Sequence, residues 1–142
     1  MTTSTLTEQA APNAVLMDLE MLQGTWVTIC GRREAELLFA GHHFTVRFMD
    51  GDLYMGRFAL NPHGHPKVME MTIDEGPDHH QGKVARCLYD LAHDALRWCA
   101  PEPGVGERLG SFPAVQDKRF LSLLFRRELP HPRKDGQAEE AH

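Results

Sequence analysis

Hydrophobic and polar residues alternate in short runs along the chain from residue 25 to residue 127. Met69, Met71 and Ile73, for example, alternate with Glu70 and Thr72. A period of two is typical of a β-strand that buries one face, because successive side chains point to opposite sides of the sheet. Runs of this kind lie at residues 25–30, 35–40, 43–49, 52–60, 67–73, 83–91, 95–100 and 119–127. The pattern therefore predicts an all-β domain of eight consecutive strands.

A helical period precedes the first strand. Val15, Leu19 and Leu22 are spaced as on one face of a short amphipathic helix over residues 13–23. Consecutive strands joined by short connections favour an up-and-down meander that closes on itself. We therefore expect an eight-stranded antiparallel up-and-down barrel whose N-terminal helix closes one end.

The helical pattern runs directly into the segment Leu22-Gln23-Gly24-Thr25-Trp26. Eight strands enclose a lumen only wide enough for side chains or one small ligand, so the indole of Trp26 can plug its floor. A cationic side chain at the end of the last strand would lie across this ring, and Arg126 or Arg127 has that position.

Two hairpin turns decide which residues face one another. Asp50-Gly51 predicts a two-residue type I′ turn, which places Val46 opposite Met55 and Phe44 opposite Arg57. The second pair brings a guanidinium group into the interior, where it needs an anionic partner. A β-bulge next to Arg57 would instead turn this side chain outward, and we favour the bulge.

The second hairpin is expected to turn near Ala92-His93. A two-residue register places Cys87 opposite Trp98 and Tyr89 opposite Leu96, all on the apolar face. A three-residue loop would mix polar and apolar residues on each face, so we reject it.

These faces predict a shared interior. Its expected members are Trp26, Phe44, Val46, Met55, Met69, Met71, Cys87, Tyr89, Leu96 and Trp98. An interior of this size is either a packed core or a ligand cavity. The methionines slightly favour a cavity, because this side chain adapts to varied apolar shapes.

The two ends of the chain have a different composition. Residues 1–12 are rich in Thr, Ala and Gln and are predicted to be disordered. Residues 129–142 are charged and contain proline, and we expect a flexible tail there. The barrel domain is therefore predicted to span residues 13–128.

Composition and charge exclude several partners. The formal net charge is −5, whereas a nucleic-acid-binding surface needs a basic stripe. No stretch approaches the roughly 20 apolar residues of a membrane-spanning helix. Because the first basic residue is Arg32, no secretory signal is recognised, and three cysteines do not suggest a disulfide framework. We expect a reduced, cytoplasmic protein that binds neither nucleic acid nor a membrane.

Several short motifs occur in a fixed order between residues 18 and 128. They are Leu22-Gln23-Gly24-Thr25-Trp26, Gly56-Arg57-Phe58-Ala59-Leu60, Pro66-Lys67, Leu88-Tyr89-Asp90-Leu91, Leu96 with Cys99 and Ala100, and Arg127-Glu128. In this set the chain resembles a small lipocalin-like domain family, largely uncharacterised and known mainly from planctomycete genomes. The resemblance implies an antiparallel lipocalin-like barrel, and the family has no common activity to transfer. An Arg-Pro pair usual before its Ser-Phe segment is absent, and many relatives are exported, whereas no signal is recognised here.

Three functions are compatible with such an interior. The leading hypothesis is a protein that binds a small apolar or amphipathic metabolite in the lumen. The second is a cofactor-independent enzyme, a biosynthetic cyclase, dehydratase or isomerase, in which Tyr89 donates a proton and an inward Arg57 stabilises negative charge. The third is an interaction domain with a filled core, such as a homodimer. No nucleotide, phosphate or hydrolase motif occurs, and no cofactor is expected.

Connections alternate between the two ends of an up-and-down barrel. The helix end should hold the connections at 41–43, 61–66 and 92–94, and the opposite end, the mouth, those at 31–34, 50–51, 74–82 and 101–118. His42, His63 and His65 would then share the helix end and could supply three imidazoles to a metal. Their spacing matches no recurring metal motif, so we favour solvated loop histidines.

Overall fold

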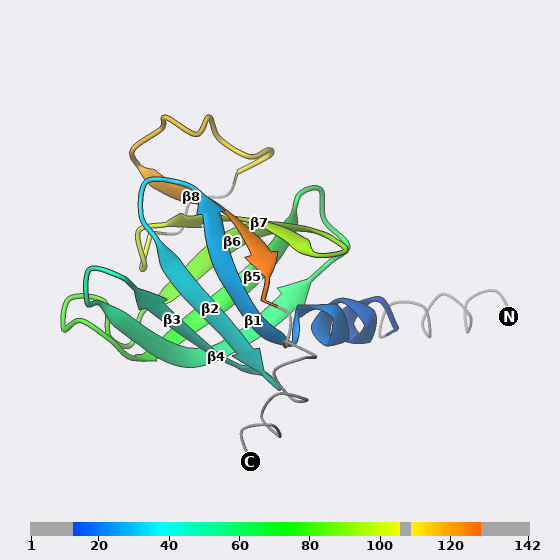
Figure 1. Cartoon of the computed structure of the whole chain (residues 1–142), viewed down its shortest axis with the longest axis horizontal. Coiled ribbons are helices and arrows are strands. Elements are labelled where there is room, and N and C mark those ends of the chain that lie inside the picture. Colours follow the sequence, from blue (N-terminus) through cyan, green and yellow to red (C-terminus); the bar gives the residue numbers. More distant parts are fainter. Residues whose placement is uncertain (1–12, 106–108, 129–142) are drawn as a thin grey trace, which may run out of the picture.

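The strands close into a single antiparallel barrel in which each strand pairs with the next and β8 pairs with β1 (Figure 1). The computed structural model describes residues 13–105 and 109–128, so the predictions for residues 1–12 and 129–142 lie outside the described residues. The strands are β1 (Gly24–Cys30), β2 (Ala35–Ala40), β3 (His43–Phe48), β4 (Leu53–Asn61), β5 (Lys67–Glu75), β6 (Val84–Ala92), β7 (Ala95–Pro101) and β8 (Phe120–Arg127). The predicted all-β barrel is confirmed, and the largest error in a boundary is at the end of β5.

The barrel interior contains nearly all the side chains expected there. Trp26, Phe44, Val46, Met69, Met71, Cys87, Tyr89, Leu96 and Trp98 are all buried and belong to one core cluster. This result follows from alternation alone, because each strand contributes every second residue to the same side of the sheet.

Met55 is the exception, and the turn between β3 and β4 explains it. Phe48 N donates to Asp52 O at 2.9 Å, and Gly51 N donates to Phe48 O at 3.0 Å. The turn therefore has three residues, with Gly51 at φ 115°, rather than the predicted two. Because a one-residue change of register exchanges the two faces, Met55 pairs with Thr45 and lies on the outer face.

Arg57 points outward, away from the barrel interior. The corrected register accounts for this without a bulge between β3 and β4, because Phe44 pairs with Gly56 instead of Arg57. A register shift does occur, but between β4 and β5, where Asp74 is the additional residue. The Arg57 guanidinium donates two hydrogen bonds of 2.9 Å to the Asp74 carboxylate, which lower the pKa of Asp74 and raise the pKa of Arg57.

The N-terminal helix, residues 13–22, packs against one end of the barrel (Figure 1). The Trp26 indole N–H donates to the Leu22 carbonyl at 2.8 Å, which ties the floor of the barrel to the last helical turn. The Arg127 guanidinium lies 4.3 Å from the centroid of the Trp26 ring and donates to the carbonyls of Met21 and Gln23. The predicted cation over the indole is therefore confirmed as Arg127.

The hairpin between β6 and β7 turns one position later than predicted, with His93 at φ 47°. Tyr89 consequently pairs with Trp98 rather than with Leu96. The predicted pairing is wrong by two residues. Because side chains alternate between the faces with a period of two, every side chain still lies on its predicted face of the sheet. On the outer face, Cys99 is nevertheless buried, in a small apolar cluster with Leu88 and Phe120 against which Leu109 and Phe112 pack.

Candidate functional site

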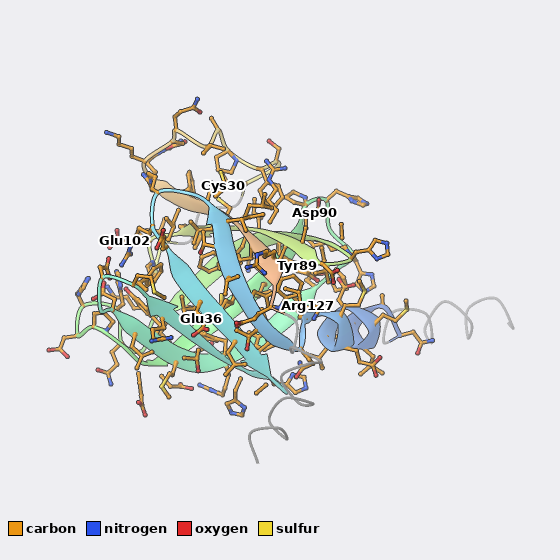
Figure 2. All side chains as sticks on the ribbon, in the orientation of Figure 1. Cys30, Glu36, Tyr89, Asp90, Glu102 and Arg127 are labelled. Carbon is orange, nitrogen blue, oxygen red and sulfur yellow. The ribbon has the colours of Figure 1, made fainter. Side chains whose placement is uncertain are left out.

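A cavity of about 220 Å³ lies at the mouth, the barrel end away from the helix. Figure 2 shows Glu102 at this end and Arg127 beside the helix. The inner wall is apolar and is formed by Phe44, Val46, Phe48, Met71, Ile73, Ala85, Cys87 and Trp98. The rim is polar and contains Arg32, Arg33, Tyr54, His80, Glu102, Lys118 and Arg119. The cavity is therefore amphipathic, with its polar side toward the loops.

The barrel interior differs between its two halves. Trp26 and Tyr89 form hydrogen bonds to the helix and do not line the cavity, so the helix half is a packed core. The cavity occupies the mouth half. Its volume is below the roughly 300 Å³ of a drug-sized pocket, but it exceeds the ~150 Å³ that suffices to hold benzene in an engineered core. It suits a molecule about the size of a single substituted ring.

Trp98 lines this cavity and carries a buried hydrogen-bond donor. Its side chain is 4% exposed and packs edge-on against Phe125, with ring centroids 6.0 Å apart. Its indole Nε1 has no hydrogen-bond partner among the described residues. A buried donor without a partner costs about 1–3 kcal/mol, so such groups are rare and call for an explanation. A ligand with an acceptor oxygen in the cavity would provide the partner.

The rim of the cavity carries an excess of positive charge. Arg33 is neutralised by Asp50 and Asp52, at 2.7 and 3.2 Å, and its guanidinium stacks on Phe48. Arg32 donates to the Phe120 carbonyl at 2.7 Å and forms no ion pair within 4 Å in the described part of the chain, although it contributes to lowering the pKa of the Asp117 carboxylate. Lys118 likewise forms none with any residue that the structure describes. These two cations favour an anionic group at the mouth.

A hydrogen-bonded chain of three polar side chains lies at the rim of the cavity. The Tyr54 hydroxyl lies 2.7 Å from His80 Nδ1, and His80 Nε2 lies 3.2 Å from a carboxylate oxygen of Glu102. Burial raises the pKa of Tyr54, and the nearby carboxylate of Asp52 adds to this effect. No sequence motif indicates this chain, because its members come from three separate segments.

Tyr89, the predicted proton donor, has a different partner from those considered. Its hydroxyl donates to the Asp18 carboxylate at 2.8 Å, and Lys67 Nζ lies 3.0 Å from the same oxygen. Burial, followed by this hydrogen bond, raises the pKa of Tyr89. With Tyr89 engaged by the helix and Arg57 outside the barrel, neither residue reaches the cavity. The structure therefore gives no geometric support to the catalytic pair expected from sequence.

Asp18 is a buried carboxylate that the sequence analysis missed. It lies between Val15 and Leu22 on the helix face that meets the barrel, and it is 8% exposed. The spacing in the sequence could have indicated this position. Asp18 follows Val15 by three positions and precedes Leu22 by four, so it lies within the apolar stripe of the helix.

The structure does not assemble the histidines into a metal site. His42, His63 and His65 are all exposed. Within residues 13–105 and 109–128, no group of three or more His, Cys, Asp or Glu side chains is arranged to hold a metal ion.

The three cysteines should differ sharply in reactivity. Cys30 is exposed, whereas Cys87 and Cys99 are buried, and burial raises the pKa of both buried thiols. Because the thiolate is the reactive form, we expect Ellman's reagent to modify one thiol per native chain rapidly and the other two only after denaturation. Cys30→Ser should abolish the rapid phase. Rapid modification of a second thiol in the native protein would contradict this assignment.

Fold and cavity together define a lipocalin-like barrel, closed at one end by a helix and hollow at the other. No match was found in comparisons with protein-family models, curated proteins and solved structures. Among the described residues, no helix has the length and apolar character needed to span a membrane.

Proposed function

We propose that this protein binds a small amphipathic molecule in the mouth half of the barrel. The molecule has an oxygen acceptor for the Trp98 indole, a short apolar body and an anionic group near the rim. The observation that carries this proposal is that Trp98 is one of the residues lining the cavity, and that its buried indole N–H has no hydrogen-bond partner among the described residues. A carboxylate that also bears a ketone is the simplest chemistry that meets all three conditions.

The charge of the rim supports the anionic end of such a ligand. Arg32 and Lys118 form no ion pair with a described residue, and both line the cavity. A carboxylate between apolar walls and a cationic rim keeps its charge near solvent while its body leaves water. Among the described residues, Glu102 is the only one with a carboxylate that lines the cavity, and it lies next to His80.

The proposal includes two expectations from sequence. A cytoplasmic location is supported by three cysteines that form no disulfide among the described residues. Kinship with the planctomycete lipocalin-like family is supported by the use of the Leu-Gln-Gly-Thr-Trp segment at the barrel floor. A homodimer stays a prediction.

The test uses the two indole N–H signals of the protein in a proton–nitrogen NMR titration. Levulinate, which carries a carboxylate and a ketone, should shift the Trp98 signal saturably. The Trp26 signal should not shift, because its N–H is hydrogen-bonded to the Leu22 carbonyl. Valerate, which lacks the ketone, should bind about 2- to 12-fold more weakly, since one net hydrogen bond contributes ~0.5–1.5 kcal/mol.

Trp98→Phe is the matched control, because it removes the N–H and retains most of the ring. In this variant, levulinate and valerate should bind with equal affinity, which can be measured by calorimetry. The proposal fails if small keto-carboxylates, levulinate included, leave the Trp98 signal unchanged. It also fails if Trp98→Phe leaves the preference for levulinate intact.

A further inference from the structure

Three loop-adjacent segments bring ionisable side chains together at the cavity rim. Tyr54 lies on β4, His80 lies between β5 and β6, and Glu102 follows β7. The distances of 2.7 Å and 3.2 Å along this chain are those of consecutive hydrogen bonds. All three residues line the cavity, and the Glu102 side chain is far more exposed than that of His80, at 64% against 13%.

The Glu102 carboxylate fixes the direction of its hydrogen bond with His80, and the neutral form of the imidazole then fixes the direction of the bond with Tyr54. A carboxylate can only accept, so His80 Nε2 must carry a proton that it donates to Glu102. In the neutral imidazole, Nδ1 is then the acceptor, and the Tyr54 hydroxyl donates to it. The second lone pair of the Tyr54 oxygen is left to accept a proton from another group. This is the arrangement of a base that is oriented by a third residue.

The loop that carries His80 is held in place before any ligand binds. His80 N and Gln81 N both donate to the Pro77 carbonyl, at 2.9 and 3.0 Å, and Gly82 N donates to Ile73 O at 2.8 Å. The His80 side chain is only 13% exposed. The Tyr54 ring packs edge-on against Phe48, with centroids 5.9 Å apart. A base fixed in this way needs little reorganisation when a proton moves.

We propose that Tyr54 and His80, positioned by Glu102, act as a general base that removes a proton from a carbon next to a carbonyl group of a bound ligand. This inference rests on the proposed function, because it needs a carbonyl compound in the same cavity. Trp98, which lines the same cavity, carries the complementary donor for the carbonyl oxygen.

The step transfers one proton and leaves every oxidation state unchanged. The C–H proton passes to the Tyr54 oxygen as the Tyr54 proton passes to His80 Nδ1. The C–H bonding pair becomes part of an enolate, whose oxygen accepts the Trp98 hydrogen bond. The reverse transfer returns a proton to carbon, either the original one or one exchanged with solvent. The net reaction is isomerisation or hydrogen exchange next to the carbonyl.

The test follows deuterium incorporation into levulinate in heavy water by proton NMR. The wild-type protein should speed the loss of signal from the hydrogens next to the ketone above the rate in buffer. Tyr54→Phe and His80→Gln should each lower this catalysed rate by about 100-fold or to the buffer rate, since general-base catalysis typically contributes 10²–10⁴-fold. Glu102→Gln should lower the rate at saturating levulinate and leave the Trp98 titration unchanged, as expected for a positioning residue.

His63→Gln is the matched control, because it removes an exposed imidazole at the helix end of the barrel. It should exchange levulinate at the wild-type rate. If levulinate shifts the Trp98 signal but is exchanged no faster than in buffer, the general base is overturned and the binding function stands. Loss of both the shift and the exchange overturns both proposals. Exchange that persists in Tyr54→Phe and in His80→Gln overturns the assignment of the base.

Discussion

Asp18→Ala is expected to lower the free energy of unfolding by about 1–3 kcal/mol, the cost of leaving a buried polar group without its partner. The group concerned is the hydroxyl of Tyr89, a residue that is 1% exposed, and it donates to Asp18 at 2.8 Å. Lys67 contributes less to this loss, because its side chain is one-third exposed and can return to water. The same substitution also releases the helix from the barrel end, so the helix should lose protection against hydrogen exchange first.

A double-mutant cycle with Tyr89→Phe separates the hydrogen bond from other effects. If the hydroxyl causes the loss, Asp18→Ala should cost markedly less in the Tyr89→Phe background than alone. Urea denaturation followed by tryptophan fluorescence measures each free energy. Glu20→Ala, an exposed acidic residue of the same helix, is the matched control and should change stability by less than about 0.5 kcal/mol. Equal costs for Asp18→Ala with and without the hydroxyl would contradict the role assigned to this bond.

Gly56→Ala is expected to destabilise the barrel by about 3 kcal/mol or more, at the upper end of the range for overpacked interiors. A Cβ at this position would lie 1.8 Å from the Thr72 carbonyl oxygen and 3.0 Å from the backbone nitrogen of Asp74. Both atoms belong to the backbone of β5, so no change of rotamer can relieve the contact. The two strands would have to separate at the place where their register shifts.

Gly110→Ala provides the control for Gly56→Ala. Apart from the neighbours of Gly110 in the chain, no described residue has an atom within 4 Å of a Cβ built at Gly110, so its substitution should change the free energy of unfolding by less than about 0.5 kcal/mol. Both variants can be compared by the midpoint of urea denaturation and by the amide spectrum of β4 and β5. A loss of free energy of unfolding below about 1 kcal/mol for Gly56→Ala would contradict this expectation, because it would mean that β4 and β5 separate at little energetic cost.

The two halves of the barrel have different physical roles. In the helix half, the Tyr89 hydroxyl donates to Asp18, and the side chains of Trp26 and Arg127 donate to the backbone carbonyls of Leu22 and Gln23. At the mouth, the Trp98 N–H has no partner within the described part of the chain. The interior is therefore packed next to the helix and contains a cavity toward the mouth. The sequence analysis treated a packed core and a cavity as alternatives for the whole interior. The structure contains both, one in each half of the barrel.

Alternation by itself determined the barrel, its strand boundaries to within two residues, and most of its interior. Met69, Met71 and Ile73 could be assigned to the inside because burial follows a period of two, whatever their partners are. The indole of Trp26 and the cation over it could also be predicted, because both lie at strand ends whose pairing a closed meander requires.

Only the tertiary structure decided the register of the turns and the partners of the polar groups. Gly51 is compatible with both a two-residue and a three-residue turn. The structure has the three-residue turn, and its additional residue places Met55 on the outer face instead of the inner face. Asp18 reaches Tyr89 across 71 positions of the chain, and Tyr54 reaches His80 across 26. Hydrophobic burial is non-directional and leaves a periodic trace in the sequence, whereas a hydrogen bond depends on distances of a few tenths of an ångström between distant segments.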